Sequence, residues 1–505
     1  MILVVDFGSQ TAHLIGRRVR ELGVGVEYVD PEEVLEKVDE FKPNGLIFSG
    51  GPASVYADDA HGIDVKVFGL GLPILGICYG WQLMARDLGG EVKSHGKEYG
   101  PENVIVKSSK GILPEGVDKF SAVMSHGDSV TKLPKGFSVC AKTRGVVFAG
   151  VENAKKKFFG LQFHPEVEHT EHGKEILKKF VGEVCGEDLS PVLLDPGKIV
   201  AEIQIKVRDR KVIFAVSGGV DSTVSAFLTG KAVGKNLIPV YVESGLMRQG
   251  TEKLVKYIFS DLVKSDLVIV QAKDRFMSAL KGVTDPEVKR KTIGKLYVDI
   301  FTEEAAKHPE ADFLGQGTIY SDVIESKGSK KASKIKSHHN VGGLPDNMEL
   351  ELLEPMRNYY KDEVRELGRM AELPEEVVQQ QPFPGPGYAV RIRGEVTEFR
   401  LEQVRIADLI VVEEMKRSGM YERVFQCFAV MTGAYSTAVK GDSRAFAEVV
   451  AVRAYESSDV MTSQWADIPH QVLAKISSRI VNEVSDVSRV VYDITTKPPA
   501  TMEWE

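Results

Sequence analysis

Cysteine is scarce in this chain of 505 residues. Its four cysteines are too few for a disulfide framework, and no two form a C-x-x-C pair; they are Cys78, Cys140, Cys185 and Cys427. A reducing compartment is therefore the simpler expectation. The same scarcity argues against enzymes that depend on a paired-cysteine metal site or a thiol carrier.

Long hydrophobic runs are also missing, with one apparent exception. Residues 67–85 carry no charge, but they include four glycines and a proline, which suit a buried strand and a turn better than a membrane span. The first six residues place Asp6 directly after the four apolar residues Ile2–Val5 and lack a basic stretch, so they predict a strand and not a signal peptide. We expect a cytoplasmic protein without a membrane segment.

An excess of positive charge is absent as well. Lysine and arginine number 64 against 72 for aspartate and glutamate, giving a net charge of -8. A protein that binds nucleic acid through the phosphate backbone would carry the opposite balance. Hydrophobic residues at 43% and charged residues at 27% are typical of folded globular domains, and the length suggests about three of them.

The order of apolar runs predicts the domain organisation. Short strand-like runs alternate with helical stretches up to about residue 185, where a Gly- and Pro-containing linker interrupts them, and the alternation then resumes. The turn-rich string at 382–387 breaks the pattern again. We therefore predict two successive α/β domains with mainly parallel sheets, at 1–188 and 189–381, and a small α+β domain at 382–505.

A candidate nucleophile lies in the first domain. The string Gly76-Ile-Cys-Tyr-Gly80 follows an apolar strand and precedes a helix-like stretch, as in a nucleophile elbow with cysteine in place of serine. The glycines are needed because side chains would collide in so sharp a turn. The helix start would favour a thiolate at Cys78. Taken alone, the string also fits a buried cysteine in an ordinary Gly-rich turn.

A histidine and a carboxylate complete the arrangement. The string Phe163-His-Pro-Glu-Val167 places His164 and Glu166 after another strand. A thiol needs a base to take its proton, and the base needs an acceptor that orients it. The Gly-Gly turn at 50–51 follows a further strand, and the amides of Gly51 and of Tyr79 could form an oxyanion hole.

These three separated motifs resemble the class I glutamine amidotransferases, which release ammonia from the side-chain amide of glutamine. The match covers about residues 1–185 and includes Gly50-Gly-Pro52. The resemblance implies a class I glutaminase fold with Cys78 as nucleophile, His164 as base and Glu166 as its orienting partner.

A candidate phosphate-binding motif lies in the second domain. The string Ser217-Gly-Gly-Val-Asp-Ser222 lies between a strand and a helix-like stretch, where glycine amides, serine hydroxyls and the helix start can hold pyrophosphate. It consists of Ser217, Gly218, Gly219, Val220, Asp221 and Ser222. No Walker A string occurs in the chain. Asp221 would repel a phosphate directly but could bring a magnesium ion to it.

This string resembles the PP-loop ATP pyrophosphatases, which adenylate an acceptor oxygen and share the adenine nucleotide α-hydrolase-like fold. Combined with a glutaminase, it implies exchange of a C–O for a C–N bond. Further strings over almost the whole chain are similar to one family, the glutamine-hydrolysing GMP synthetases; they are Met124–Asp128, Phe313–Thr318, Ile335–Leu344, Gln381–Gly387 and Lys497–Glu505.

The resemblance implies that XMP, ATP and glutamine, with magnesium, become GMP, AMP, pyrophosphate and glutamate. It implies a homodimer through the C-terminal domain, with no prosthetic group and no nucleic-acid or membrane partner. By the same resemblance the xanthosine nucleotide is held by Arg290, Asp442, Lys497 and Glu503. The C-terminal tail would then be functional and not frayed.

Two features depart from simple expectation. The lysine-rich stretch 327–336 fits a solvated loop, but the resemblance favours a mobile lid in which Lys336 closes over the phosphates. After the second strand of the ATP domain, Glu243 and Ser244 stand where the family usually has other residues, so adenosine contacts there can differ. Lys155–Lys157 predicts a hairpin turn.

Two alternatives remain from the residues alone. One is an RNA-modifying PP-loop enzyme, against which the net charge and the absence of C-x-x-C argue. The other is a regulatory relative that binds nucleotides without turnover, against which the intact candidate triad and PP-loop argue.

Overall fold

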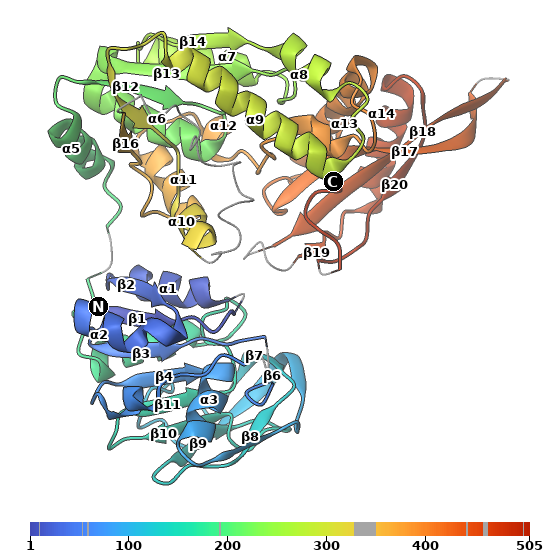
Figure 1. Ribbon diagram of the computed structural model, residues 1–505. Coiled ribbons are helices and arrows are strands. Elements are labelled where there is room, and N and C mark those ends of the chain that lie inside the picture. Colours follow the sequence, from blue (N-terminus) through green and yellow to red (C-terminus); the bar gives the residue numbers. More distant parts are fainter. Residues whose placement is uncertain are drawn as a thin grey trace. The chain divides into compact units, whose positions relative to one another are not determined.

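The computed structural model describes residues 1–9, 11–52, 54–57, 60–190, 193–327, 350–440, 443–457, 463–497 and 499–505. The chain divides into two compact units, Met1–Leu193 and Leu194–Glu505 (Figure 1). No helix in the described part of the chain combines the length and the apolar character needed to cross a bilayer. The uncharged stretch 67–85 forms part of a 3-10 helix, one strand and most of a helix.

The first unit is built on a sheet of nine strands in the order β2-β1-β3-β4-β11-β10-β9-β6-β7. The first five of these pair in parallel and the others antiparallel; their bounds are Val26–Val29, Ile2–Val5, Gly45–Phe48, Ile74–Ile77, Phe158–Leu161, Gly150–Asn153, Ser138–Lys142, Glu98–Val106 and Lys119–His126. Strands β5 (Glu91–Lys93) and β8 (Ser129–Lys132) form a separate two-stranded antiparallel sheet in the same unit. The turn predicted at Lys155–Lys157 is confirmed, since it joins the antiparallel strands β10 and β11.

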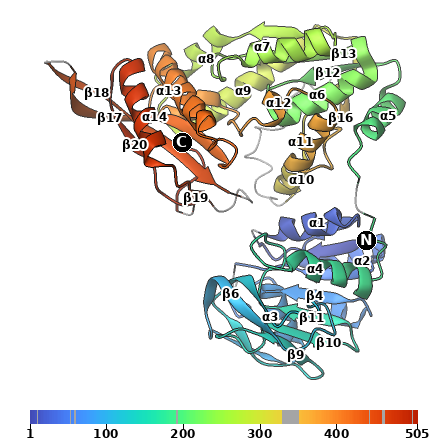
Figure 2. The ribbon, with the colours of Figure 1, turned by 180° about the vertical axis from the view of Figure 1, so that it is seen from behind.

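Helices cover both faces of this sheet (Figures 1 and 2). Alternate residues of β1 point to opposite faces, as expected for a strand buried on both sides. Ile2 and Val4 pack with α1 (Ala12–Glu21) and α4 (Gly173–Lys178), whereas Leu3 and Val5 pack with α2 (Val34–Phe41) and α3 (Tyr79–Asp87). The carboxyl ends of the parallel strands therefore open between two helical layers.

The second unit contains a fully parallel sheet in the order β14-β13-β12-β15-β16. Helices on one face pack in one hydrophobic cluster and the helix α9 packs on the other. The strands are Val268–Gln271, Leu237–Glu243, Lys211–Ala215, Ala311–Gly315 and Glu351–Leu353. The helices are α5 (Pro196–Val207), α6 (Val220–Val233), α7 (Thr251–Lys256), α8 (Lys273–Leu280), α9 (Pro286–Ala305), α10 (Tyr320–Lys327), α11 (Lys361–Met370) and α12 (Glu375–Val378).

The same unit holds a four-stranded sheet built from residues 426–492. Two long antiparallel strands, β17 (Gln426–Lys440) and β18 (Ser443–Glu456), form its ribbon, with β19 (Gln464–Trp465) and β20 (Val487–Tyr492) on the other side of β18. Helices α13 (Glu398–Arg417) and α14 (His470–Glu483) pack on it, and one hydrophobic cluster joins these elements to α8 and α9. Mixed α/β architecture with mainly parallel sheets, as predicted, is confirmed.

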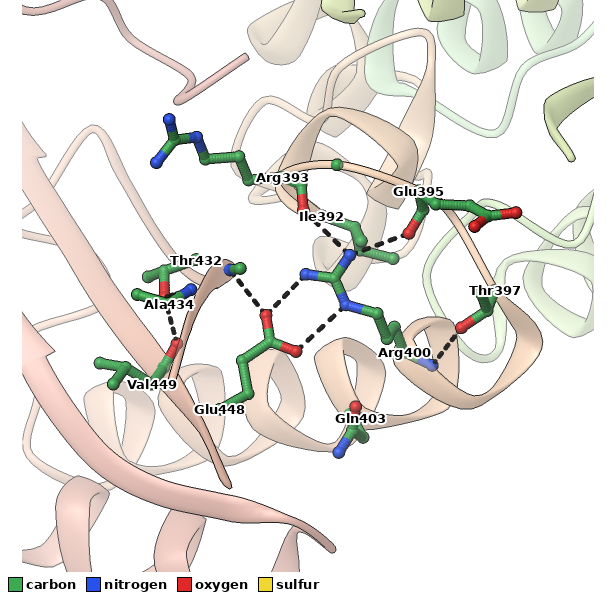
Figure 3. Close-up of polar contacts among 12 residues, drawn as sticks. Ile392, Arg393, Glu395, Thr397, Arg400, Gln403, Thr432, Ala434, Glu448 and Val449 are labelled. Atoms are coloured by element: carbon green, nitrogen blue, oxygen red, sulfur yellow. Dashed lines mark hydrogen bonds and ion pairs between the residues drawn. The ribbon is translucent and has the colours of Figure 1, made fainter. Parts of the chain in front are cut away.

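An irregularity in β17 lies beside a partly buried ion pair between Arg400 and Glu448 (Figure 3). Arg400 donates to both carboxylate oxygens of Glu448, at 2.6 and 3.1 Å, and Glu448 accepts the amide of Gly433 at 2.7 Å. Arg400 also donates to the backbone carbonyls of Arg393 and Glu395 at 2.9 and 2.8 Å. The pair therefore ties the loop before α13 to the bulged strand.

Candidate active site

The order of the parallel strands assembles the first candidate site. Strand β4 lies between β3 and β11, so the segments that follow these three strands meet at one edge of the sheet. Gly50 and Gly51 follow β3, Cys78 follows β4, and His164 follows β11. The three predicted motifs are therefore brought together by sheet topology.

The turn at Cys78 has the geometry of a nucleophile elbow. Cys78 adopts φ 51° and ψ -106°, a region that L-residues rarely occupy and that costs on the order of 1–3 kcal/mol. A Cβ on Gly76 would lie 2.7 Å from the amide nitrogen of Trp81, and one on Gly80 would lie 2.6 Å from the carbonyl oxygen of Phe48. The expected collision is real at both glycines, because the obstructing atoms are backbone.

Two polar groups contact the thiol besides the expected base. The thiol of Cys78 lies 3.6 Å from the carbonyl oxygen of Ser125, and the side-chain amide of Gln162 donates to the sulfur at 3.6 Å. Gln162 is fully buried, and its Oε1 accepts no hydrogen bond within the described residues. Gln162 therefore helps to fix the position of the sulfur.

The imidazole of His164 is held between the thiol and a buried carboxylate. Its Nδ1 lies 2.7 Å from Oε1 of Glu166, which is completely buried. Burial lowers the pKa of His164, but the Glu166 carboxylate and the hydrogen bond to Cys78 outweigh it, and the pKa lies well above 6.5. The arrangement therefore favours an imidazolium next to the sulfur at neutral pH.

The backbone around the elbow lies against the Gly-Gly turn. The amide of Gly80 donates to the carbonyl oxygen of Ser49 at 3.0 Å. A Cβ on Gly51 would lie 2.9 Å from Cγ of Tyr79, so only glycine permits this approach. The structure thus brings Gly51 and Tyr79, the two residues of the predicted oxyanion hole, next to each other.

Three residues at this site were not singled out by the sequence arguments. Gln162 had a usable signal, because it precedes His164 by two residues, and that spacing can place both side chains on one side of an extended segment. Ser125 lies within a family-like string but contributes only its backbone. Thr11, whose hydroxyl donates to Oε1 of Glu166 at 2.8 Å, gave no signal in its own sequence.

The predicted PP-loop is the connection between β12 and α6. Oγ of Ser222 accepts the amide of Ser217 at 3.1 Å and lies 2.9 Å from Oγ of Ser217. Gly218 has φ +78°, and a Cβ there would lie 2.4 Å from Cγ2 of Thr251. Gly219 occupies the N-cap position of α6, which begins at Val220. The loop is thus shaped by contacts between its own serines.

Asp221 lies in the first turn of α6 with its two oxygens in different surroundings. Oδ2 accepts from the ammonium of Lys361 on α11 at 3.1 Å. Oδ1 is buried and accepts no hydrogen bond from any residue that the structure describes. A free carboxylate oxygen at the mouth of a phosphate loop fits a magnesium ligand. Within the described residues, no group of three or more His, Cys, Asp or Glu side chains could hold a metal by itself.

The residues after β13 are engaged within the protein. Ser244 is fully buried and accepts from the hydroxyl of Tyr297 at 2.7 Å. Glu243 accepts the amide of Gly245 at 2.8 Å and the hydroxyl of Tyr241 at 3.1 Å. Burial of Tyr241 and the neighbouring Glu243 charge raise the pKa of the tyrosine. These bonds shape the turn at the end of β13.

The residues expected to hold the nucleotide are partly within the described structure. Arg290 lies near the start of α9, where it pairs with Glu287 at 3.6 Å. Lys497 lies in a bridge to Ser463, and Glu503 is in the tail that follows. Asp442 and Lys336 lie outside the described residues.

The C-terminal tail is anchored by buried cations, and Arg391 is one of them. It is fully buried and donates to both oxygens of Glu503 at 3.0 and 3.1 Å. Lys289, also fully buried, pairs with Glu505, and Arg453 donates to the carbonyl oxygen of Met502 at 3.1 Å. The tail is therefore bound into the unit and ends at the start of α9.

A hollow of about 660 Å³ lies at the same place. Its lining includes Asp285 and Pro286 at the start of α9, the exposed Arg393 and the terminal Glu505. Lys289, which pairs with Glu505, is the residue before Arg290. The hollow therefore brings the end of the tail and the start of α9 into one concave surface, of a size that small ligands occupy.

Comparison with known proteins gives matches at two levels. The glutamine amidotransferase class-I model matches residues 3–184, and the model of the GMP synthase C terminal domain matches residues 413–504. Relatives from Lactobacillus acidophilus, Nitratiruptor sp. and Clostridium botulinum are 48%, 49% and 49% identical. Each match covers 100% of this chain and 98%, 99% and 99% of the relative. All three relatives carry the name glutamine-hydrolyzing GMP synthase.

Proposed function

The chain belongs to the family of glutamine-hydrolysing GMP synthases, and from that premise we propose that it makes GMP from XMP, ATP and glutamine. Glutamine is hydrolysed to glutamate and ammonia. ATP adenylates the C2 oxygen of the xanthine base with release of pyrophosphate, and ammonia then loses a proton and displaces AMP. The observation that carries the proposal is the convergence of Cys78, His164 and Glu166 at one edge of a sheet.

In the glutaminase half, we assign the three side chains separate roles. The Cys78 thiolate attacks the side-chain carbonyl carbon of glutamine, and the Gly51 and Tyr79 amides stabilise the oxyanion. His164 gives its proton to the leaving nitrogen, which departs as ammonia and leaves a thioester. Water, deprotonated by His164, then hydrolyses the thioester to glutamate. Glu166 accepts Nδ1–H throughout and so keeps Nε2 directed at the reacting atoms.

In the ATP half, the loop from Ser217 to Ser222 would cradle the pyrophosphate, supported by the hydroxyls and by the start of α6. Lys361 adds a positive charge beside the loop through its contact with Asp221. Magnesium, held in part by Asp221, would neutralise phosphate charge when ATP is bound. The protein's part is to position the α-phosphate against the acceptor oxygen.

The xanthosine nucleotide would lie where the C-terminal tail meets α9. Arg290 suits the 5′-phosphate, while Asp442, Lys497 and Glu503 suit the base and ribose. The pairing of Glu505 with Lys289, next to Arg290, supports this location, since it brings the tail to the same helix. Lys336 would close over the phosphates as part of a lid. We propose domain boundaries at about residues 188 and 381, so that the C-terminal domain completes the nucleotide site.

We further propose that the protein is a homodimer through the ribbon of β17 and β18. Three apolar side chains on this ribbon are exposed: Tyr435 by 55%, Val439 by 75% and Phe446 by 73%. The Tyr435 and Phe446 rings stack on each other, with centroids 5.7 Å apart. Large exposed apolar groups gathered in one place are typical of protein interfaces. A cytoplasmic location stays a prediction.

The proposed function is tested by GMP formation from XMP, ATP and magnesium, with glutamine or ammonium as nitrogen donor. We expect GMP from both donors in the wild type and from ammonium alone in Cys78→Ala. Cys140→Ala, which removes another buried thiol of the same unit, serves as the matched control and should keep both activities. Absence of GMP with either donor in folded wild-type protein would mean that the acceptor is another molecule. RNA is then the first one to try, because an RNA-modifying enzyme is the alternative that the PP-loop itself allows.

A further inference from the structure

We propose that Thr11 is a positioning residue of the glutaminase: its hydroxyl fixes the Glu166 carboxylate, which in turn orients His164. This inference rests on the proposed function, because it assigns Thr11 a role in the same triad. It concerns a residue 155 positions away from Glu166 in the sequence.

The hydroxyl of Thr11 does not cap the helix that follows it. Thr11 is the N-cap of α1, where a threonine oxygen ordinarily accepts a backbone amide of the first turn. It makes no such cap bond; its Oγ1 donates instead to Oε1 of Glu166 at 2.8 Å. The helix thus lacks a stabilising contact that its sequence could provide, and the hydroxyl serves the carboxylate.

Both donors to Glu166 converge on one oxygen. Oε1 receives the Thr11 hydroxyl and lies 2.7 Å from Nδ1 of His164. Oε2 is buried and accepts no hydrogen bond from any other described residue. Without the Thr11 hydroxyl, His164 would be the only hydrogen-bonding partner among the described residues left on this fully buried carboxylate, which could then rotate and lose its fixed position.

The nearby cation does not replace this bond. Arg18 donates through Nε to the backbone carbonyl of Glu166 at 3.1 Å, not to its carboxylate. Nη1 of Arg18 lies 2.9 and 3.0 Å from the two carboxylate oxygens of Glu21. The Arg18 charge is therefore already paired, and Thr11 is a neutral donor to the Glu166 carboxylate.

A second hydroxyl supports the first. Oγ of Ser9 lies 3.0 Å from Oγ1 of Thr11 and accepts the amide of Thr11 at 3.2 Å. Because Thr11 gives its proton to Glu166, Ser9 is free to give its own to Thr11, in a chain that ends at the sulfur. A Cβ on Gly50 would lie 3.2 Å from both Ser9 Oγ and Cε1 of His164, so Gly50 leaves room for both groups.

The test compares Thr11→Val, which removes the hydroxyl at nearly constant volume, with Thr11→Ser, which keeps it. We expect Thr11→Val to lower the glutaminase kcat about tenfold, with KM within about twofold, since a hydrogen bond to a charged group is lost and substrate contacts are not. Thr11→Ser should stay within about twofold of wild type. Thr131→Val is the matched control, because that hydroxyl donates to a backbone carbonyl, Glu91 O, in the same unit.

A second readout is independent of GMP formation. Alkylation of Cys78 by iodoacetamide, followed by peptide mass mapping, reports the reactivity of the thiol beside His164. It should slow in Thr11→Val and in Thr11→Ala, and stay unchanged in Thr11→Ser and Thr131→Val. Ammonium-driven GMP formation should be equal in all variants.

Two results would overturn the inference. Wild-type kcat and alkylation in Thr11→Val would show that the hydroxyl is dispensable, and an equal loss in Thr11→Ser would show that the methyl group matters instead. If the wild type makes no GMP from either donor, the proposed function fails, while the alkylation series still decides the role of Thr11. Should Thr11→Val not fold, Thr11→Ala gives the same comparison.

Discussion

Replacing Arg391 by methionine should loosen the C-terminal tail by a calculable amount. The guanidinium is fully buried, donates to both oxygens of Glu503, and lies 3.4 Å from Oδ1 of Asp408. Burial lowers the pKa of Arg391, but Glu503 and Asp408 outweigh it, so the pKa is raised and the residue stays charged. The substitution leaves Glu503 without its cation, while Asp408 keeps Arg248, whose Nε lies 4.0 Å from Oδ2.

Removing one partner of a buried ion pair costs roughly 3–5 kcal/mol. We expect about 2–3 kcal/mol here, because the Glu503 side chain is 17% exposed and can turn toward water. Two other buried cations, Lys289 and Arg453, still hold the tail. This loss lowers the free energy of local opening of the tail. At about 1.4 kcal/mol per factor of ten, the tail amides should exchange about 30- to 150-fold faster.

Hydrogen exchange followed by mass spectrometry measures this on the full chain. The amides of Lys497 and Ala500, bonded at 2.9 and 3.0 Å, report the tail, and strands β6 and β7 give an internal reference. Arg369→Met is the matched control, because this exposed arginine also pairs with two glutamates. Tail exchange within twofold of wild type in Arg391→Met would refute the argument that the buried pair anchors the tail. A double variant that also carries Glu503→Gln should recover part of the loss, since one stranded charge is gone.

Three further predictions concern the triad, the elbow and the dimer. In Glu166→Gln, the pKa of His164 should fall, because the carboxylate no longer opposes the effect of burial; nitrogen NMR in the wild type should show His164 protonated at pH 7. Since the folded pKa is raised, the stability that His164 contributes is full below pH 6.5 and is lost as the pH rises through the folded pKa. Gly80→Ala should abolish glutaminase activity while ammonium-driven synthesis remains, because the new methyl would meet Phe48 backbone at 2.6 Å; a wild-type rate would contradict this. Phe446→Asp should convert a dimer into a monomer by light scattering, and an unchanged mass would exclude the ribbon as the interface.

Several parts of this protein could be predicted from short strings of sequence. The elbow at Cys78 and the loop at Gly218 depend on local backbone geometry, with a positive φ or no space for a Cβ, and glycine spacing records that requirement directly. The alternation of apolar runs predicted the α/β architecture that the structure has, and the motifs predicted the family, which the full-length relatives confirm.

Other contacts could not be predicted, because they join residues far apart in the chain. Thr11 meets Glu166 across 155 positions and Lys361 meets Asp221 across 140, and neither hydroxyl nor ammonium stands in a pattern that names its partner. The anchoring of the tail by Arg391 could not be predicted either, because nothing in the sequence distinguishes a buried arginine from an exposed one.

The sequence by itself determined which local turns form and which chemical groups they present, because steric exclusion at glycine and the charge of side chains act over a few residues. Tertiary structure alone decided which groups meet. Strand order places β4 between β3 and β11, and helix packing brings α1 to the same edge. This strand order and helix packing follow from the burial of apolar faces over the whole unit. The free energy of that burial is a sum of many small contributions, which no single motif contains.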